Sequence, residues 1–232
     1  MTNAHALATE LIQAFRVPPD GMGAAAPAPV GPATIGPGVR AGGHAGSRAD
    51  LLDTLVRRRS QRFFAPEPIP AELLADVIVS GIRDDAGAWP GEQPLQTDVV
   101  AFDVAGVEPA MFRFDAGPRV FSPVAPLPPP DELENLTLQT EFCHAPAIVS
   151  IAVDLTEADR AHGAHGYRLV LGRAGAAAYT MWLEAIALGL AGTVFAGFIP
   201  AAVRRPLRAD GTSRHHVFAL AVGRELRDQR RE

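Results

Sequence analysis

Apolar side chains recur at helical spacing in four stretches of the chain. In the first stretch, Leu7, Leu11 and Phe15 fall on one face of a helix. The last stretch is the longest, and its many small residues allow another backbone to approach closely. The pattern predicts helices at residues 4–16, 49–59, 71–82 and 167–190, with Ser47 as the N-cap of the second helix and Gly189 at the end of the last.

Runs of β-branched and aromatic residues mark the expected strands. The run at residues 147–153 is apolar throughout, as in a strand buried on both faces. A turn signal at residues 106–109 joins two of the runs into a hairpin. Strands are predicted at residues 97–104, 110–114, 147–153, 193–198 and 217–222, and loops at residues 83–96 and 122–131. Because helices come before, between and after the strands, we predict an α+β fold with a central antiparallel sheet flanked by helices.

Residues 17–47 are rich in Pro, Gly and Ala and carry almost no charge. Such a segment buries too little side chain to form a domain of its own. We interpret it as an extended strap that lies along the domain surface, since Pro-rich segments lose little entropy on docking. The expected organisation is a helix and strap at residues 1–48, one domain at 49–224 and a charged tail at 225–232.

Composition narrows the function classes. With 232 residues, 47% of them hydrophobic, the chain can build a sizeable core. Its net charge of −5 argues against general nucleic-acid binding. All 21 basic residues are arginine, so a lysine Schiff base and a lysine acid or base are excluded.

The chain shows no sign of a metal, disulfide or membrane-spanning segment. Its one cysteine, Cys143, excludes an internal disulfide and a cysteine-built metal site, and we expect it to be a small half-buried residue. No histidine pair is completed to a metal site of known geometry. No signal peptide and no apolar run of about 20 residues is apparent, so a cytoplasmic protein without a membrane partner is expected.

The most distinctive chemistry lies in the segment Arg57-Arg58-Arg59-Ser60-Gln61-Arg62-Phe63-Phe64. Guanidinium groups recognise phosphate through several donors, and a serine hydroxyl adds another hydrogen bond. The segment is therefore a candidate anion site. A solvated basic turn at the C-terminus of a helix explains the same charges, since the helix dipole favours cations there.

Two further segments allow two interpretations each. The glycines of residues 189–200 would let the backbone approach a flat ligand, or they mark a helix C-cap followed by a buried strand. This run lacks the spacing of a dinucleotide or P-loop fingerprint. Asp84 and Asp85, in the expected loop, could bind a cation or could simply be solvated.

Taken together, these stretches resemble the FMN-dependent nitroreductase superfamily, and most closely its SagB-type dehydrogenases, which oxidise azolines to azoles in peptide natural products. The resemblance is carried by the segment 55–64 with Pro68-Ile69, by the stretch 94–115 with its Gly-x-x-Pro turn, and by Ala145-Pro146 before a strand. The helix ending in Ala-Leu-Gly-Leu and the closing Val222-Gly223-Arg224 fit as well, so the likeness covers about residues 50–224.

The resemblance implies a domain-swapped-style homodimer with FMN at the subunit interface and the long helix in the dimer core. It places Arg58, Arg59, Ser60 and Arg62 at the flavin phosphate, ribityl chain and pyrimidine edge. Phe195, Ala196 and Gly197 match the segment that lies along the isoalloxazine ring. Arg224, or one of Arg227, Arg230 and Arg231, would supply a basic C-terminal contact to the phosphate.

The sequence departs from the family pattern in ways that bear on activity. The flavin-touching loop with a serine corresponds to residues 87–93 here, which contain none. The Lys-Tyr pair of azole-forming members has no counterpart, and Tyr167 and Tyr179 are the only phenols, so we assign no catalytic residue. The implied function is an FMN-dependent dehydrogenase of a heterocyclised peptide or related natural-product intermediate. The alternatives are an NAD(P)H-dependent nitro- or quinone reductase, and a non-catalytic scaffold in a biosynthetic complex.

Overall fold

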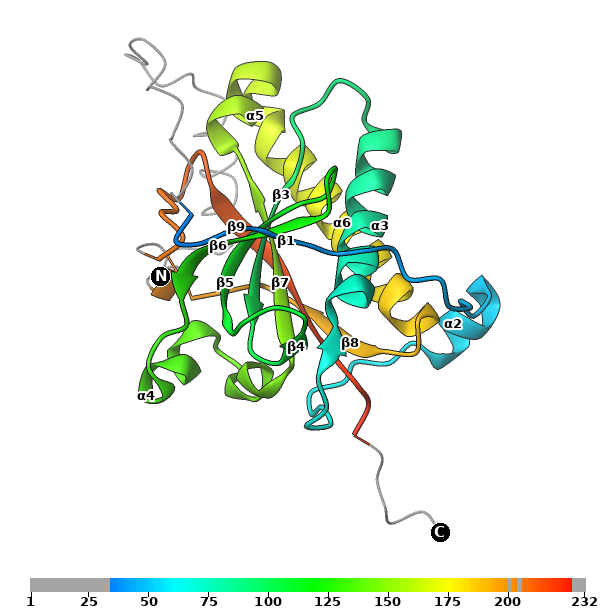
Figure 1. The fold of residues 1–232 in the computed structure, drawn as a ribbon. Helices are drawn as coiled ribbons and strands as arrows, with labels where there is room; N and C mark the ends of the chain where they lie inside the picture. The colour runs from blue at the N-terminus through cyan, green and yellow to red at the C-terminus, as the bar shows by residue number, and fades with distance from the viewer. Residues whose placement is uncertain (1–33, 200–201, 204–205, 227–232) are drawn as a thin grey trace, which may run out of the picture.

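The computed structural model describes residues 34–199, 202–203 and 206–226. Within them, seven strands form one antiparallel sheet in the order β1-β6-β5-β3-β7-β9-β8 (Figure 1). These strands are β1 (Val39–Arg40), β3 (Gln96–Ala101), β5 (Ala110–Asp115), β6 (Val120–Pro126), β7 (Ala147–Val153), β8 (Ala191–Phe195) and β9 (His215–Gly223). A separate parallel pair joins β2 (Ile69–Pro70) to β4 (Val104–Ala105). The expected antiparallel central sheet is confirmed.

The structure gives the bounds of five α-helices, and residues 202–203 are helical as well. The five are α2 (Leu51–Arg57), α3 (Ala71–Ala88), α4 (Pro130–Leu133), α5 (Leu155–His162) and α6 (Gly166–Ala187). Short 3-10 turns cover residues 134–136, 140–144 and 163–165. None of the described helices is long and apolar enough to cross a membrane. The helix predicted at residues 4–16 and the tail residues 227–232 lie outside the described residues.

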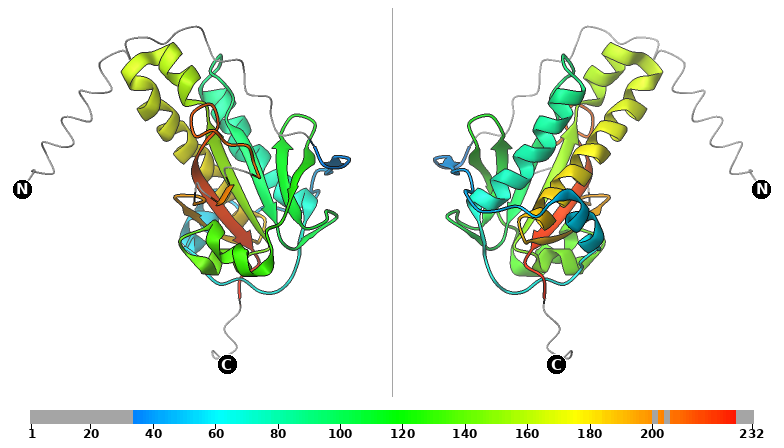
Figure 2. Two further views of the ribbon diagram at one scale, coloured as in Figure 1. Left: turned by 90° about the vertical axis from the view of Figure 1, so that its left-hand side faces the viewer. Right: turned by 90° about the vertical axis from the view of Figure 1, so that its right-hand side faces the viewer.

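The core has one layer on each face of the sheet. Helices α3 and α6 lie side by side on one face, as Figure 2 shows. Alternation along the strands sends Val99 and Phe112 toward these helices, whereas Val100 and Met111 point to the other face. There they pack with Phe142 and other residues of the connecting segments.

Several sequence predictions of local structure were wrong. Residues 83–96 were expected to form a loop, but α3 continues through them to Ala88. The expected loop at 122–131 contains most of β6, which includes Pro123. Helix α2 begins three residues later than the Ser47 cap implied, because the Asp50 side chain accepts a hydrogen bond from the backbone N–H of Asp53, 2.9 Å away.

A buried ion pair explains why α3 extends so far. Asp85 and Arg173 of α6 form a bidentate pair, with Nε–Oδ1 and Nη2–Oδ2 distances of 2.9 and 2.7 Å. Both side chains are buried. Asp85 therefore neither binds a cation nor lies in solvent, and Asp84 accepts a hydrogen bond from Thr180, 3.0 Å away.

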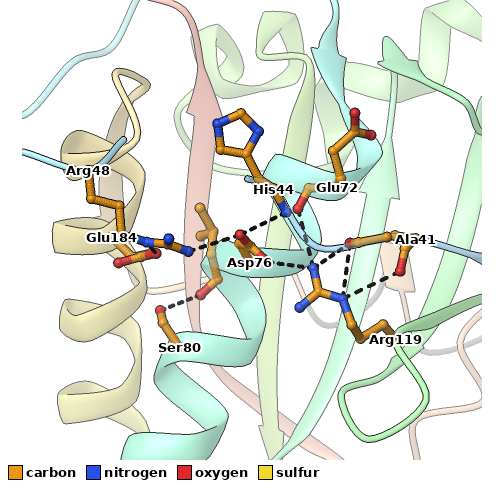
Figure 3. A network of polar contacts seen from close by, with 10 residues as sticks. Ala41, His44, Arg48, Glu72, Asp76, Ser80, Arg119 and Glu184 are labelled. Atoms are coloured by element: carbon orange, nitrogen blue, oxygen red, sulfur yellow. Dashed lines mark hydrogen bonds and ion pairs between the residues drawn. The ribbon is translucent and has the colours of Figure 1, made fainter. Parts of the chain in front are cut away.

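The segment that precedes α2 is fixed to the domain by a polar network around Asp76 of α3 (Figure 3). Arg48 and Arg119 donate to its two carboxylate oxygens over 2.9 and 2.5 Å. Arg48 also pairs with Glu184 of α6 over 2.6 Å, which raises the pKa of Arg48. Residues 39–48 thus lie along the domain surface and are tied to both long helices.

Close contact of α3 with α6 depends on Gly81. A Cβ at this position would lie 2.5 Å from the carbonyl oxygen of Ala177 and 2.6 Å from Cγ of Met181. Backbone atoms cannot yield at such a distance, so the two helices would have to separate. The tight packing of the helical layer therefore requires a glycine here.

We predict that Gly81→Ala lowers the free energy of unfolding by about 1–3 kcal/mol, because it overpacks the helix contact. Gly87→Ala is the matched control in the same helix, since nothing lies within 4 Å of its Cβ position. It should leave stability unchanged or raise it by up to about 1 kcal/mol. Urea denaturation followed by circular dichroism measures both; equal losses in the two variants would contradict the packing argument.

Candidate functional site

A cavity of about 390 Å³ opens where the C-terminal ends of α2 and α6 meet the start of β8. Its wall combines several basic and polar groups with apolar side chains. The lining residues are Val56, Arg57, Arg58, Arg59, Gln61, Ile186, Gly189, Leu190, Ala191 and Glu225. A ligand with an anionic group and an apolar part fits such a wall.

Backbone hydrogen bonds hold the segment after α2 against the edge of the sheet. The backbone N–H of Gln61 donates to the carbonyl of Gly192 in β8 over 3.2 Å. The hydroxyl of Thr193 donates to the carbonyl of Gln61 over 2.6 Å. Farther along, the N–H of Ala65 donates to the carbonyl of Arg224 over 3.0 Å. The segment therefore crosses the ends of both β8 and β9.

This crossing requires a glycine at position 223, the last residue of β9. A Cβ there would lie 2.6 Å from Cδ of Pro146 and 2.8 Å from Cδ1 of Phe64. Phe64 also forms an isolated β-bridge with Glu225. The absence of a side chain at Gly223 lets the aromatic end of the arginine segment lie directly on the sheet.

Of the four predicted arginines, Arg58 and Arg59 line the cavity, whereas Arg62 and Arg224 do not. Each of the four has a neighbour. The guanidinium of Arg58 lies over the ring of Trp182, 4.9 Å from its centroid. Arg59 forms an ion pair with Glu225. Arg62 lies 3.5 Å from a carboxylate oxygen of Glu141, and Arg224 lies 3.6 Å from one of Glu67.

These ion pairs are weak because water reaches them. The side chains of Arg59, Arg62 and Arg224 are 72, 64 and 40% exposed. Exposed pairs contribute at most about 1 kcal/mol each. A phosphate, which offers shorter and multiple hydrogen bonds, can therefore replace the carboxylates. Ser60 is exposed beside them.

The second predicted group, Phe195, Ala196 and Gly197, lies farther along β8. None of the three lines the arginine cavity. Phe195 packs on Phe142 with ring centroids 4.5 Å apart, and Gly197 has a φ of 104°, which favours glycine. Gly189, with a φ of 77°, ends α6 as predicted. The glycine run is thus a helix C-cap followed by the strand β8. This strand begins at the arginine cavity and ends at Phe195.

Sequence reasoning missed Trp182 and Glu225 as neighbours of the site. In the sequence, Trp182 is one of many apolar residues in the long predicted helix, and Glu225 is the first residue of the predicted charged tail. The Nε1 atom of Trp182 is buried, and no described residue accepts a hydrogen bond from it. No sequence spacing links either residue to the arginine segment, which is more than 100 positions away.

Two other candidate groups, Cys143 and Tyr179, do not line the arginine cavity. Cys143 is buried, and burial raises the pKa of its thiol, which disfavours a nucleophilic thiolate. Tyr179 of α6 is 41% exposed, with its ring 6.1 Å from that of Trp182. Among the residues that the structure describes, no group of three His, Cys, Asp or Glu side chains could hold a metal ion.

The model of the Nitroreductase family matches residues 55–224, which contain α3, α6 and six strands of the large sheet. The chain belongs to the nitroreductase family. It is therefore an oxidoreductase by family. The match includes all eight residues proposed from the sequence as cofactor contacts, since these lie between Arg58 and Arg224.

Comparisons with individual proteins agree with the family. A Methanocaldococcus jannaschii protein that is named as a nitroreductase is 27% identical over 185 residues, which are 76% of this chain and 91% of that protein. A structure from Anabaena variabilis, also described as a nitroreductase, has a TM-score of 0.62 at 21% identity. It covers 75% of this chain, whereas the chain spans only 38% of that protein.

A third similar structure is the E. coli microcin synthetase McbBCD complex with truncated pro-MccB17 bound. The TM-score is 0.58 at 14% identity, and the match covers 79% of this chain and 76% of the other. At such identities the two structures establish the fold alone.

The described residues fit FMN, the cofactor expected for a nitroreductase. The arginines and the mixed wall of the cavity suit the phosphate end of such a molecule. Beside Arg58, the buried Nε1 of Trp182 has no acceptor among the described residues, although Trp182 itself does not line the cavity. Arginine donors on the cavity wall outnumber the single carboxylate of Glu225, so the wall favours an anion.

We predict that Glu225→Gln tightens FMN binding about two- to fivefold, because it removes a negative charge from the wall and frees Arg59. Fluorescence titration with FMN measures the affinity. Glu157→Gln is the control, since Glu157 has a comparable surface pair with Arg160 away from this cavity and should bind FMN like the native protein. Weaker binding by the Glu225 variant would show that this carboxylate holds the cofactor instead of opposing it.

Proposed function

We propose that this nitroreductase uses FMN to dehydrogenate a heterocyclised peptide or a related natural-product intermediate, converting an azoline to an azole. The observation that carries the cofactor assignment is the cavity lined by Arg57, Arg58 and Arg59 with an apolar wall. The substrate class rests on the resemblance of the sequence to SagB-type dehydrogenases. A microcin synthetase complex with truncated pro-MccB17 bound has a similar fold, which is compatible with a peptide substrate.

Different residues of the chain would bind different parts of the cofactor. Arg58, Arg59, Ser60, Arg62 and Arg224 supply donors for the phosphate and for the polar edge of the cofactor. Their positive charge also stabilises negative charge that develops on a reduced ring. Bound FMN supplies a two-electron acceptor for a hydride from the substrate carbon.

A second group would provide the surface for the flat ring. Phe195, Ala196 and Gly197 follow one another at the end of β8, where the positive φ of Gly197 turns the backbone. A residue without a side chain lets a planar ligand approach the backbone closely. The strand β8 connects this surface to the arginine cavity, which suits an elongated cofactor.

Exposed apolar side chains support a homodimer with a shared site. Leu51, Leu52 and Val56 of α2 are 63, 75 and 86% exposed, and the nearby Phe63 is 63% exposed. Contiguous apolar side chains of this kind are typical of a protein contact. Val56 also lines the arginine cavity, so a second copy that covers α2 would close this side of the site.

Anaerobic turnover tests the proposal. The FMN-loaded protein should lose its visible flavin absorption when it is mixed with a thiazoline-containing peptide, and mass spectrometry should show that the peptide has lost two hydrogen atoms. The corresponding thiazole peptide is the control and should leave the flavin oxidised. Reduction by NAD(P)H without reduction by the azoline would favour a nitro- or quinone reductase. Failure to bind FMN would leave a scaffold role.

A further inference from the structure

A second cavity of about 390 Å³ lies away from the arginine segment. It opens where β3 begins, β5 ends and the chain enters β9. The lining residues are Ile82, Pro94, Leu95, Gln96, Thr97, Arg113, Phe114, Asp115, Ala116, Gly117 and Arg214. Two arginines therefore face one cavity in a part of the protein to which no function is yet attached.

Arg113 of β5 lacks partners for buried donors. Its Nε and Nη2 atoms are buried, and no described residue accepts a hydrogen bond from them. A buried donor without an acceptor destabilises the fold, and more so when it is charged. The arrangement becomes favourable once an acceptor reaches the guanidinium.

The carboxylate that lies opposite Arg113 in the sheet already has two other partners. Asp98 of β3 lies directly opposite Arg113 in the strand pairing. Its oxygens accept from Arg214 Nε at 2.9 Å and from Arg214 Nη2 at 2.7 Å, and Oδ2 lies 2.9 Å from Nε2 of His216. Although burial alone would raise the pKa of Asp98, these two partners lower it.

Arg113 is therefore an arginine of this cavity for which no ion pair is found among the described residues. Asp98 neutralises one of the two arginines. Asp115 also lines the cavity, but it is exposed and its Oδ1 accepts from the backbone N–H of Gly117, 3.0 Å away. Burial and then the charge of Arg214 lower the pKa of Arg113, so its guanidinium is held where a positive charge is unfavourable.

We propose that this cavity binds an oxyanion, a carboxylate or phosphate group, through Arg113 with support from Arg214. Both groups offer oxygen atoms that match a guanidinium fork. An anion here gives the guanidinium of Arg113 an acceptor, which it lacks among the described residues. Gln96, which accepts a hydrogen bond from Arg214, fixes the second guanidinium at the cavity wall.

The oxyanion site is separate from the proposed flavin site. Arg214 precedes the first residue of β9, whereas Arg224 and Glu225 follow its last residue. Nine extended residues span roughly 30 Å. One FMN molecule cannot reach both ends, so the second anion would belong to another ligand.

Thermal unfolding of the full chain tests the proposal. Inorganic phosphate and succinate are each compared with sodium chloride at equal ionic strength. The native protein should unfold about 2–4 °C higher in at least one of the two anions, and Arg113→Met should lose this gain. In chloride alone, Arg113→Met should be at least as stable as the native protein, because it removes an unpaired buried charge. A response to one anion only identifies the group recognised.

Arg160→Met is the matched control, because it removes an exposed arginine that lines neither this cavity nor the arginine cavity, and it should keep the gain. An equal gain in the Arg113 variant, its loss in the Arg160 variant, or no gain in the native protein would each overturn the proposal. If Arg113→Met fails to fold, the side-chain Nε–H signal of Arg113 in the NMR spectrum of the native protein decides. It should shift saturably with phosphate or succinate, and a shift equal to that in chloride would contradict the site.

Discussion

The candidate site depends on the way residues 61–65 lie across the ends of β8 and β9. Hydrogen bonds from Gln61 to Gly192 and from Thr193 to Gln61 fix the segment to the edge strand. The bare backbone of Gly223 lets Phe64 pack on the next strand. Without this contact, the arginines after α2 would project from a free loop. With it, they lie beside the end of α6 and the C-terminal end of β9.

The fold uses arginine in two physically different ways. Arg173 and Arg214 are buried in bidentate pairs with aspartates, and removal of one partner from such a pair is strongly destabilising. Arg59, Arg62 and Arg224 have exposed partners that water screens. Only the second kind can exchange a carboxylate for a ligand phosphate at little cost. Arg113 fits neither kind, since its Nε and Nη2 atoms are buried and no described residue accepts a hydrogen bond from them.

Strong periodicity made part of the structure predictable. The long apolar pattern of α6 and the continuous β-branched run of β7 both appear close to their expected bounds. Residues 83–88 were misread because their polar and glycine content is typical of a loop, whereas Asp85 is held in a helix by a partner 88 positions away. Pro123 suggested a loop, but it lies in β6. Only two residues of β6, Val120 and Phe121, pair with β1. At Pro123 the strand therefore needs no backbone N–H on the side away from β5.

The site itself was only partly visible in the sequence. The arginine segment was evident because its charges are adjacent. The approach of Trp182 and Glu225 to it is a tertiary contact without a sequence signal. The sequence gives no signal for Arg113 either. The aspartate opposite it, Asp98, pairs instead with Arg214 and His216, which are more than 100 positions away.

The central claim is that the arginine segment forms a flavin site completed by a second copy of the chain. Sedimentation velocity of the FMN-loaded protein, recorded at the visible absorption of the flavin, tests it most directly. The account predicts that the flavin sediments with a species of two chains, at one flavin for each chain. A flavin signal that stays with free cofactor, or that moves with a single chain, would contradict it.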